Sequence, residues 1–244
     1  MNICAALAFD GSAYHGWQRQ KHSVTVQGLL EEALSKVFKK SISVSGCSRT
    51  DAGVHAAMYV CNFGVARNTV PFDKLPIAVN AYLPRDIRVF KCFVVPESFS
   101  ARFSAKSKTY VYKIYNEKIL NPFLLNYTFF FSRKLDIAKM KEACKYFIGR
   151  HDFAAFAASG GSHKTTVREI FSLKVDKEGP VVEITITADA YLYNMVRIIA
   201  GTLCSIGVGK INPEDITSII NGGDRQKAGI TAPPQGLYLT DITY

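Results

Sequence analysis

The order of strand and helix patterns in the first hundred residues most limits what this chain can fold into. Short apolar or alternating runs predict strands, and apolar residues at helical spacing predict helices. The predicted elements are, in order, a strand over 3–9, a helix over 25–40, strands over 42–46 and 57–64, a helix over 71–83 and a strand over 87–95. A doubly wound sheet requires a regular alternation of strands and helices, which is missing here. We therefore expect an α+β fold, in which helices cover one face of an antiparallel sheet.

The second half has a similar make-up, without a strong internal repeat. Its predicted elements are a helix from Asp136 to Phe147, strands over 167–175 and 181–186 joined by a turn over 176–180, helices over 191–208 and from Asn212 to Gly222, and a last strand over 236–242. Two halves of this kind fit a duplicated domain. We divide the chain into an N-terminal α+β half, 1–104, and a C-terminal α+β half, 105–244.

Charge points to a polyanionic partner. The chain of 244 residues carries a formal net charge of +10, and nucleic acid is the simplest partner for such a surplus. A basic protein with solvated lysines and no such partner is the alternative. The loop over 10–22 mixes basic residues with Trp17, a combination suited to RNA contacts, but we expect Trp17 itself to cover the core.

The six cysteines are scattered, with no Cys-x-x-Cys pair and no accompanying histidine spacing. This pattern predicts neither a zinc site nor a disulfide framework, so no metal is expected. Most of the cysteines fall in apolar runs, which favours reduced, buried thiols in a cytoplasmic protein. The N-terminus lacks the pattern of a signal peptide, and no run of about 18 apolar residues predicts a membrane span.

One carboxylate, that of Asp51, lies in a stretch with a glycine near each end, Gly46-Cys47-Ser48-Arg49-Thr50-Asp51-Ala52-Gly53-Val54-His55-Ala56. Strand patterns on both sides place Asp51 on a connecting loop. Gly46 and Gly53 allow backbone angles and close approaches that larger residues forbid. Rigid strands can display a reactive group on such a loop, although Thr-Asp-Ala-Gly is also ordinary turn chemistry.

The whole stretch closely resembles the active-site motif of the tRNA pseudouridine synthase A (TruA) family. That motif usually reads Gly-Ala-Gly-Arg-Thr-Asp-Ala-Gly-Val-His-Ala, and this chain departs from it at Cys47 and Ser48, both small and upstream of the Asp. The resemblance implies that Asp51 is the catalytic nucleophile. It also implies that Arg49 helps to hold the RNA with its target base flipped out.

A second stretch, Ala101-Arg-Phe-Ser-Ala-Lys-Ser-Lys-Thr-Tyr110, also resembles that family. Alternation over 109–115 places Tyr110, Tyr112 and Ile114 on one face of a strand, where aromatic residues are usually packing. By resemblance, Tyr110 contacts the target uracil. A phenol can stack on a base and can also assist proton transfer.

Arg197 stands in an apolar helical run, flanked by Tyr193-Asn-Met-Val196 and Ile198-Ile199. A buried lone charge is costly, so either a carboxylate partner or a surface position is expected. By resemblance, Arg197 pairs with Asp51. Leu237, in the family-like run Gly236-Leu-Tyr-Leu239, would line the uracil pocket, although most leucines in strands belong to the core.

The resemblance implies a tRNA pseudouridine synthase that isomerises uridine at positions 38, 39 and 40 of the anticodon stem-loop. It implies two α+β halves with a basic cleft between them, a homodimer, and no cofactor or metal. The reaction breaks the N1–C1′ bond, rotates the uracil and rejoins it through C5. The alternative is a non-catalytic protein of the same fold that binds structured RNA. A hydrolase that uses Asp51 is the least favoured of the three hypotheses.

Overall fold

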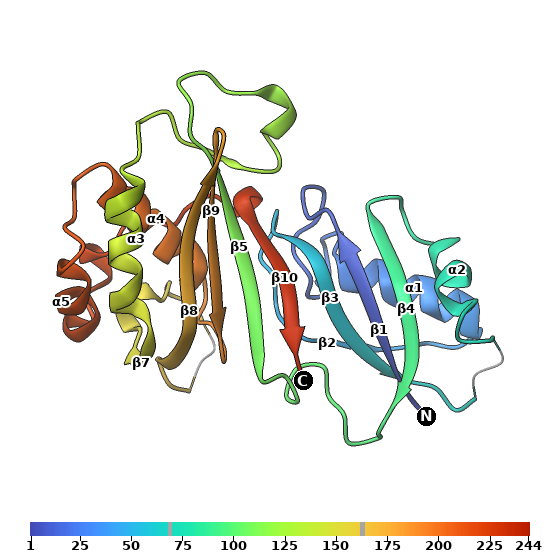
Figure 1. Ribbon diagram of the computed structural model, residues 1–244. Coiled ribbons are helices and arrows are strands. Elements are labelled where there is room, and N and C mark those ends of the chain that lie inside the picture. The colour runs from blue at the N-terminus through green and yellow to red at the C-terminus, as the bar shows by residue number, and fades with distance from the viewer. Residues whose placement is uncertain (68–69, 162–163) are drawn as a thin grey trace. The chain divides into compact units, whose positions relative to one another are not determined.

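The computed structural model describes residues 1–67, 70–161 and 164–244, with mixed α and β structure throughout. Contacts between Cα atoms divide the chain into two compact units. The first unit comprises Met1–Lys106 and Tyr238–Tyr244, and the second comprises Ser107–Leu237 (Figure 1). The C-terminal segment of the chain therefore belongs to the same unit as its N-terminus.

The first unit is built on three neighbouring strands, in the order β4 (Ile87–Val95), β1 (Asn2–Phe9) and β3 (His55–Gly64). Both pairs are antiparallel, as predicted, and Ala5 of β1 lies opposite Cys61 of β3 and Cys92 of β4. The short strand β2 (Val44–Gly46) also pairs with β3 in antiparallel fashion.

The last strand, β10 (Leu237–Thr243), departs from the expected pattern, because its pairing with β3 is parallel. Tyr238 lies opposite His55, and Leu239 lies opposite Ala56. Strands that follow each other through a tight turn must be antiparallel, but a strand that returns from the far end of the chain is free to pair in either direction. The expectation of a purely antiparallel sheet was therefore wrong at this strand.

Helix α1 (Val26–Phe38) confirms the amphipathic pattern over 25–40 and lies across one face of the strands of the first unit (Figure 1). Its N-terminus is capped by the Thr25 hydroxyl, which accepts a hydrogen bond from Gly28 N at 3.3 Å, and Lys39 ends it in the left-handed region, with φ of 51°. The second helix, α2 (Leu75–Asn80), packs against β4 and is shorter than the predicted 71–83.

The second unit contains an antiparallel series of four strands, in the order β5 (Ser107–Tyr115), β9 (Val181–Ala188), β8 (Val167–Glu178) and β7 (Gly149–Asp152). A two-residue strand, β6 (Phe129–Phe130), pairs in parallel with β5. The hairpin between β8 and β9 is tighter than the predicted turn over 176–180, because pairing continues to Glu178 opposite Val181. Gly179 makes this tight turn possible, with φ of 54°.

Three α-helices accompany these strands: α3 (Ile137–Cys144), α4 (Met195–Gly207) and α5 (Asp215–Gly222). The Asp136 carboxylate caps α3, as predicted, by accepting from Lys139 N at 3.1 Å. Helix α3 packs against both α4 and β8, and α4 is buried on almost every side. Single 3₁₀ turns occupy η1 (Pro122–Leu124), η2 (Lys145–Phe147), η3 (Ala154–Phe156), η4 (Arg225–Lys227) and η5 (Pro234–Gly236).

All six cysteines are free and buried, as the sequence indicated. Burial raises the pKa of Cys4 to about 11 and the pKa values of Cys92 and Cys204 to about 12. These thiols therefore stay neutral near pH 7. Within the described ranges, no helix has the length and apolarity to cross a membrane, and no three His, Cys, Asp or Glu residues are grouped to hold a metal ion.

Candidate active site

Asp51 lies on the loop over 47–54, which connects β2 to β3 as the sequence predicted. Its side chain is half-buried. The turn that follows it depends on Gly53, which is left-handed with φ of 78°, and Val54 N donates to Asp51 O at 3.2 Å. A residue with a side chain would be strained at Gly53. The loop thus presents one carboxylate from a fixed turn at the end of two strands.

A second loop, over 10–25, is bound to the Asp51 loop through main-chain groups. Trp17 N donates to Thr50 O at 3.2 Å, and Gly53 N donates to Tyr14 O at 3.2 Å. Gly16 is required where the loops cross, because its φ is 80° and an added Cβ would lie 2.2 Å from Thr50 O. These bonds fix the main chain on both sides of Asp51.

Beneath the Asp51 loop lies a pair of stacked aromatic rings. The rings of Trp17 and Tyr59 are 4.0 Å apart with 24° between their planes, and Trp17 is 2% exposed, which confirms its assignment to the core. The Tyr59 hydroxyl donates to the main-chain oxygen of Ser48. Gly46 closes this packing, since an added Cβ would lie 2.3 Å from the Tyr59 hydroxyl oxygen and 2.5 Å from Trp17 Nε1.

Thr50, next to Asp51, has a buried hydroxyl that lacks a hydrogen-bond partner among the described residues. Buried hydroxyls are nearly always paired, so an exception calls for an explanation such as a role in binding. Thr50 belongs to the family-like stretch around Asp51, but the stretch alone assigned it no role. Its position beside the carboxylate makes it a candidate contact for a bound molecule.

Arg49 is exposed and forms no hydrogen bond or ion pair with any residue that the structure describes. It lines a hollow of about 310 Å³ together with Arg102, which comes from the segment after β4. We call this the arginine hollow. Its other polar side chains are those of Gln18, Gln27, Ser43, Ser45, Ser48 and Asn62. No aspartate or glutamate is among the described residues that line it.

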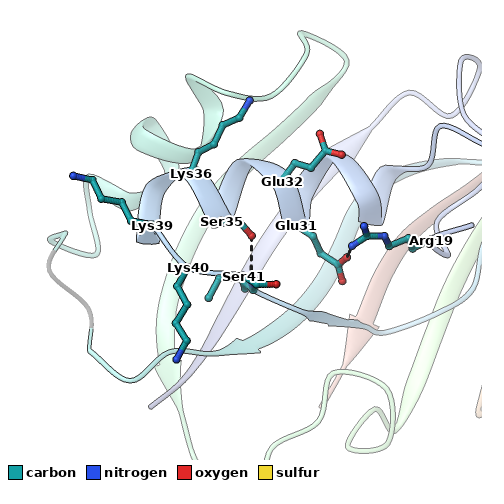
Figure 2. A pocket seen from close by; sticks show the side chains of 9 residues that line it. Arg19, Glu31, Glu32, Ser35, Lys36, Lys39, Lys40 and Ser41 are labelled. Carbon is teal, nitrogen blue, oxygen red and sulfur yellow. Dashed lines mark hydrogen bonds and ion pairs between the residues drawn. The ribbon is translucent and has the colours of Figure 1, made fainter. Parts of the chain in front are cut away.

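A second hollow, of about 510 Å³, lies at the C-terminal end of α1, and we call it the lysine hollow (Figure 2). Lys36, Lys39 and Lys40 extend outward from it, whereas Glu31 points toward Arg19. Arg19 and Glu31 form an ion pair at 2.9 Å. This hollow therefore contains basic and acidic side chains together.

In the second unit, Tyr110 lies on β5 and is 5% exposed. Its ring packs edge-on against Tyr191, with centroids 5.0 Å apart. The Tyr191 hydroxyl lies 2.8 Å from Lys108 O and 3.0 Å from Ile186 O, and burial raises the pKa of Tyr191 well above its usual value. Packing thus holds the Tyr110 ring, and its contact with uracil stays a prediction.

Arg197 lies in the first turn of α4 and is half-buried. Its Nε donates to Ala232 O at 2.7 Å, and its Nη1 donates to Asn194 Oδ1 at 2.7 Å. Asn194 precedes the helix in the left-handed region, with φ of 61°. Leu237, the first residue of β10, is buried. The pairing of Arg197 with Asp51 and the place of Leu237 in a uracil pocket stay predictions.

Comparison with known proteins finds the same description, tRNA pseudouridine synthase, for the matching family model and for the similar proteins. A family model described as tRNA pseudouridine synthase matches residues 5–104 and 143–244. The tRNA pseudouridine synthase A of Thermoanaerobacter sp. (strain X514) is 48% identical over 243 residues, and that of Caldicellulosiruptor bescii is 44% identical over 243 residues. The protein named tRNA pseudouridine synthase A 2 from Clostridium perfringens is 45% identical over 243 residues. Each match covers 100% of this chain and 99% of the relative.

Proposed function

This chain belongs to the tRNA pseudouridine synthase family and is an isomerase, and we propose that it converts uridine to pseudouridine at positions 38, 39 and 40 of the tRNA anticodon stem-loop. Full-length similarity to relatives named tRNA pseudouridine synthase A carries the proposal. The net charge of +10 supports a polyanionic substrate. Such a substrate would place the enzyme in the cytoplasm.

Asp51 is the proposed catalytic group. The reaction exchanges a carbon–nitrogen bond for a carbon–carbon bond within one nucleotide, so it transfers no electrons or phosphate and requires no cofactor. An ionised carboxylate can either attack C1′ or remove the proton from C2′. The target base must leave the stack before either step, at a cost of a few kcal/mol that pocket contacts offset. The fixed turn around Asp51 supports this role, because a catalytic group must be held in place.

The remaining site residues are proposed to bind the substrate. Arg49 would hold the RNA with its target base flipped out, and Tyr110 would contact the uracil. Arg197 would keep Asp51 ionised and oriented, and Leu237 would line the uracil pocket. This assignment requires residues from both 1–104 and 105–244 to meet in one basic cleft. The family resemblance supports that arrangement and also supports a homodimer. Sedimentation of the protein as a monomer under assay conditions would count against the dimer.

Tritium release from tRNA labelled at uracil C5 tests the function, because C5 loses its hydrogen when it bonds to C1′. We expect release from the anticodon arm without any added cofactor. Asp51→Asn should reduce release by at least about a thousandfold while RNA binding persists. Asp73→Asn is the matched control, since Asp73 is exposed in the same unit. No release by the unmodified protein, with tight and salt-sensitive RNA binding, would favour a non-catalytic RNA-binding protein.

A further inference from the structure

We propose that the arginine hollow is a binding site for a phosphate group of the RNA backbone, with Arg102 and Arg49 as its cationic partners. The inference rests on the proposed function, which supplies the RNA. It goes beyond that function by naming a further RNA-binding residue, Arg102, and the part of the RNA that it contacts, a backbone phosphate.

The first argument is the charge of the hollow. Two guanidinium groups line it, and no carboxylate is found among its described lining residues. Neither Arg49 nor Arg102 forms an ion pair with any described residue. Two like charges that share a hollow repel each other, so a bound anion relieves an existing cost as well as forming new bonds. Guanidinium groups match phosphate oxygens in geometry, which makes phosphate the favoured anion.

The second argument is that both arginines start from fixed main chain. Asn62 Oδ1 accepts a hydrogen bond from Ala101 N at 2.9 Å, which ties the residue before Arg102 to strand β3. Ala101 is fully buried. On the other side, the bond from Trp17 N to Thr50 O holds the residue after Arg49. Only the two side chains must therefore become ordered when an anion binds, which lowers the entropic cost of binding.

The third argument is size and surroundings. A volume of about 310 Å³ exceeds what a phosphate group needs and leaves room for part of a nucleotide. Trp17 and Phe63 are both buried and provide a rigid wall. The Phe103 ring is 81% exposed and lies 5.2 Å from the Arg102 guanidinium, so it offers a flat surface to an RNA base beside the hollow.

The position of the hollow indicates which phosphate it binds. Arg49 precedes Asp51 by two residues, and two residues of extended chain span at most about 7 Å. Allowing for the reach of the two side chains, we expect a phosphate held by Arg49 to belong to the target nucleotide or to one within a few nucleotides of it. Such a contact would align the substrate with the carboxylate without taking part in bond breaking.

Arg102→Gln tests the proposal, with Arg85→Gln as the matched control, because Arg85 is exposed in the same unit and does not line the hollow. In tritium release, we expect Arg102→Gln to raise KM about tenfold with little change in kcat, since the lost contact is equally strong throughout the reaction. The slope of log affinity against log salt should fall by about 0.7 to 0.9, the loss of one phosphate contact. Arg85→Gln should change neither quantity. Equal effects from the two variants would overturn the proposal.

Neutral methylphosphonate linkages, placed one at a time in an anticodon stem-loop RNA, locate the contact. One linkage near the target uridine should weaken binding to the unmodified protein about as much as Arg102→Gln does, and should weaken the variant no further. If every linkage weakened binding to Arg102→Gln as much as it weakens binding to the unmodified protein, Arg102 would contact none of these phosphates, which would contradict the proposal. If inorganic phosphate bound to the hollow while Arg102→Gln left RNA affinity unchanged, the site would belong to free phosphate and the proposal would be wrong. Absence of pseudouridine would refute the proposed function, whereas these binding measurements would still decide the contact.

Discussion

The arginine hollow and the lysine hollow lie in the same unit, and both are lined by basic side chains, yet among the described lining residues only those of the lysine hollow include carboxylates. In the lysine hollow, Arg19 is paired with Glu31, and Glu32 lies nearby. In the arginine hollow, the lining holds two arginines and no acid among the described residues. A surplus of basic residues in the whole chain therefore does not show where an anion binds. The local balance between positive and negative side chains is the more informative quantity.

The two hollows also differ in what their polar groups do. Glu31 is 5% exposed and accepts hydrogen bonds from Gln27 Nε2 at 2.9 Å and from Val44 N at 3.0 Å, so it joins α1 to β2. Polar groups of the lysine hollow thus stabilise the fold. Beside the arginine hollow, the Thr50 hydroxyl has no partner within the described residues and Arg49 forms no bond there. The comparison predicts that loss of the Glu31 carboxylate at the lysine hollow affects stability, whereas loss of a guanidinium group at the arginine hollow affects substrate binding.

The largest expected effect comes from Gly46→Ala, which would disturb the rigid wall of the arginine hollow. The added Cβ would meet the Tyr59 hydroxyl and the Trp17 ring, and overpacking of this kind lowers the free energy of unfolding by about 3 kcal/mol. Tritium release should fall with it, because these rings support the Asp51 loop. Gly64→Ala is the matched control, since Gly64 lines the same hollow and an added Cβ there would meet no described atom within 4 Å. If the two variants unfolded at the same urea concentration, the Trp17 and Tyr59 rings could move to admit the added Cβ, and the prediction would be wrong.

Glu31→Gln should have the next largest effect, and it tests whether the lysine hollow serves stability. The substitution removes a buried carboxylate that accepts from a main-chain N–H and leaves Arg19 without its partner. We expect a loss of about 2 kcal/mol in the free energy of unfolding, measured by urea titration. Glu32→Gln, at an exposed position one residue later, should change it by less than about 0.5 kcal/mol. KM for tRNA should stay unchanged in both variants, and a rise in KM for Glu31→Gln alone would break the comparison.

Local pattern was sufficient to predict the elements that frame the site. Apolar spacing located α1, and the strand–turn–strand pattern placed Asp51 on its loop. The arginine hollow could not be predicted in this way, because Arg49 and Arg102 are distant in sequence and meet through the packing of separate segments around β3. The parallel pairing of β10 with β3 was missed for the same reason, since it joins the end of the chain to its beginning. The lack of a partner for the Thr50 hydroxyl among the described residues could not be predicted either, because it depends on which groups pack around it.

Thr50→Val is expected to have a smaller effect on stability, and one of the opposite sign. Replacing a buried hydroxyl that has no partner among the described residues by a methyl group should raise the free energy of unfolding by about 1 kcal/mol. Thr25→Val is the control, because Thr25 is also buried but its hydroxyl caps α1, so this variant should lose about 1 kcal/mol. If the Thr50 hydroxyl binds substrate, Thr50→Val should be more stable but less active in tritium release. A variant with unchanged KM and kcat would remove Thr50 from the site.

The smallest effect is expected from the double substitution Lys39→Gln and Lys40→Gln in the lysine hollow. Both side chains are exposed, and the hydrogen bonds that end α1 use main-chain groups, so stability should not change. Carboxylates in the same hollow offset part of the positive potential of the lysines, and salt screens what remains of that potential. We expect RNA affinity at 0.15 M salt to fall less than about twofold, which is under about 0.5 kcal/mol. Filter binding, run beside Arg102→Gln, measures the difference. Because the double variant removes two charges and Arg102→Gln removes one, an equal or larger loss from the lysines would show that total charge, and not its local balance, governs how this protein holds RNA.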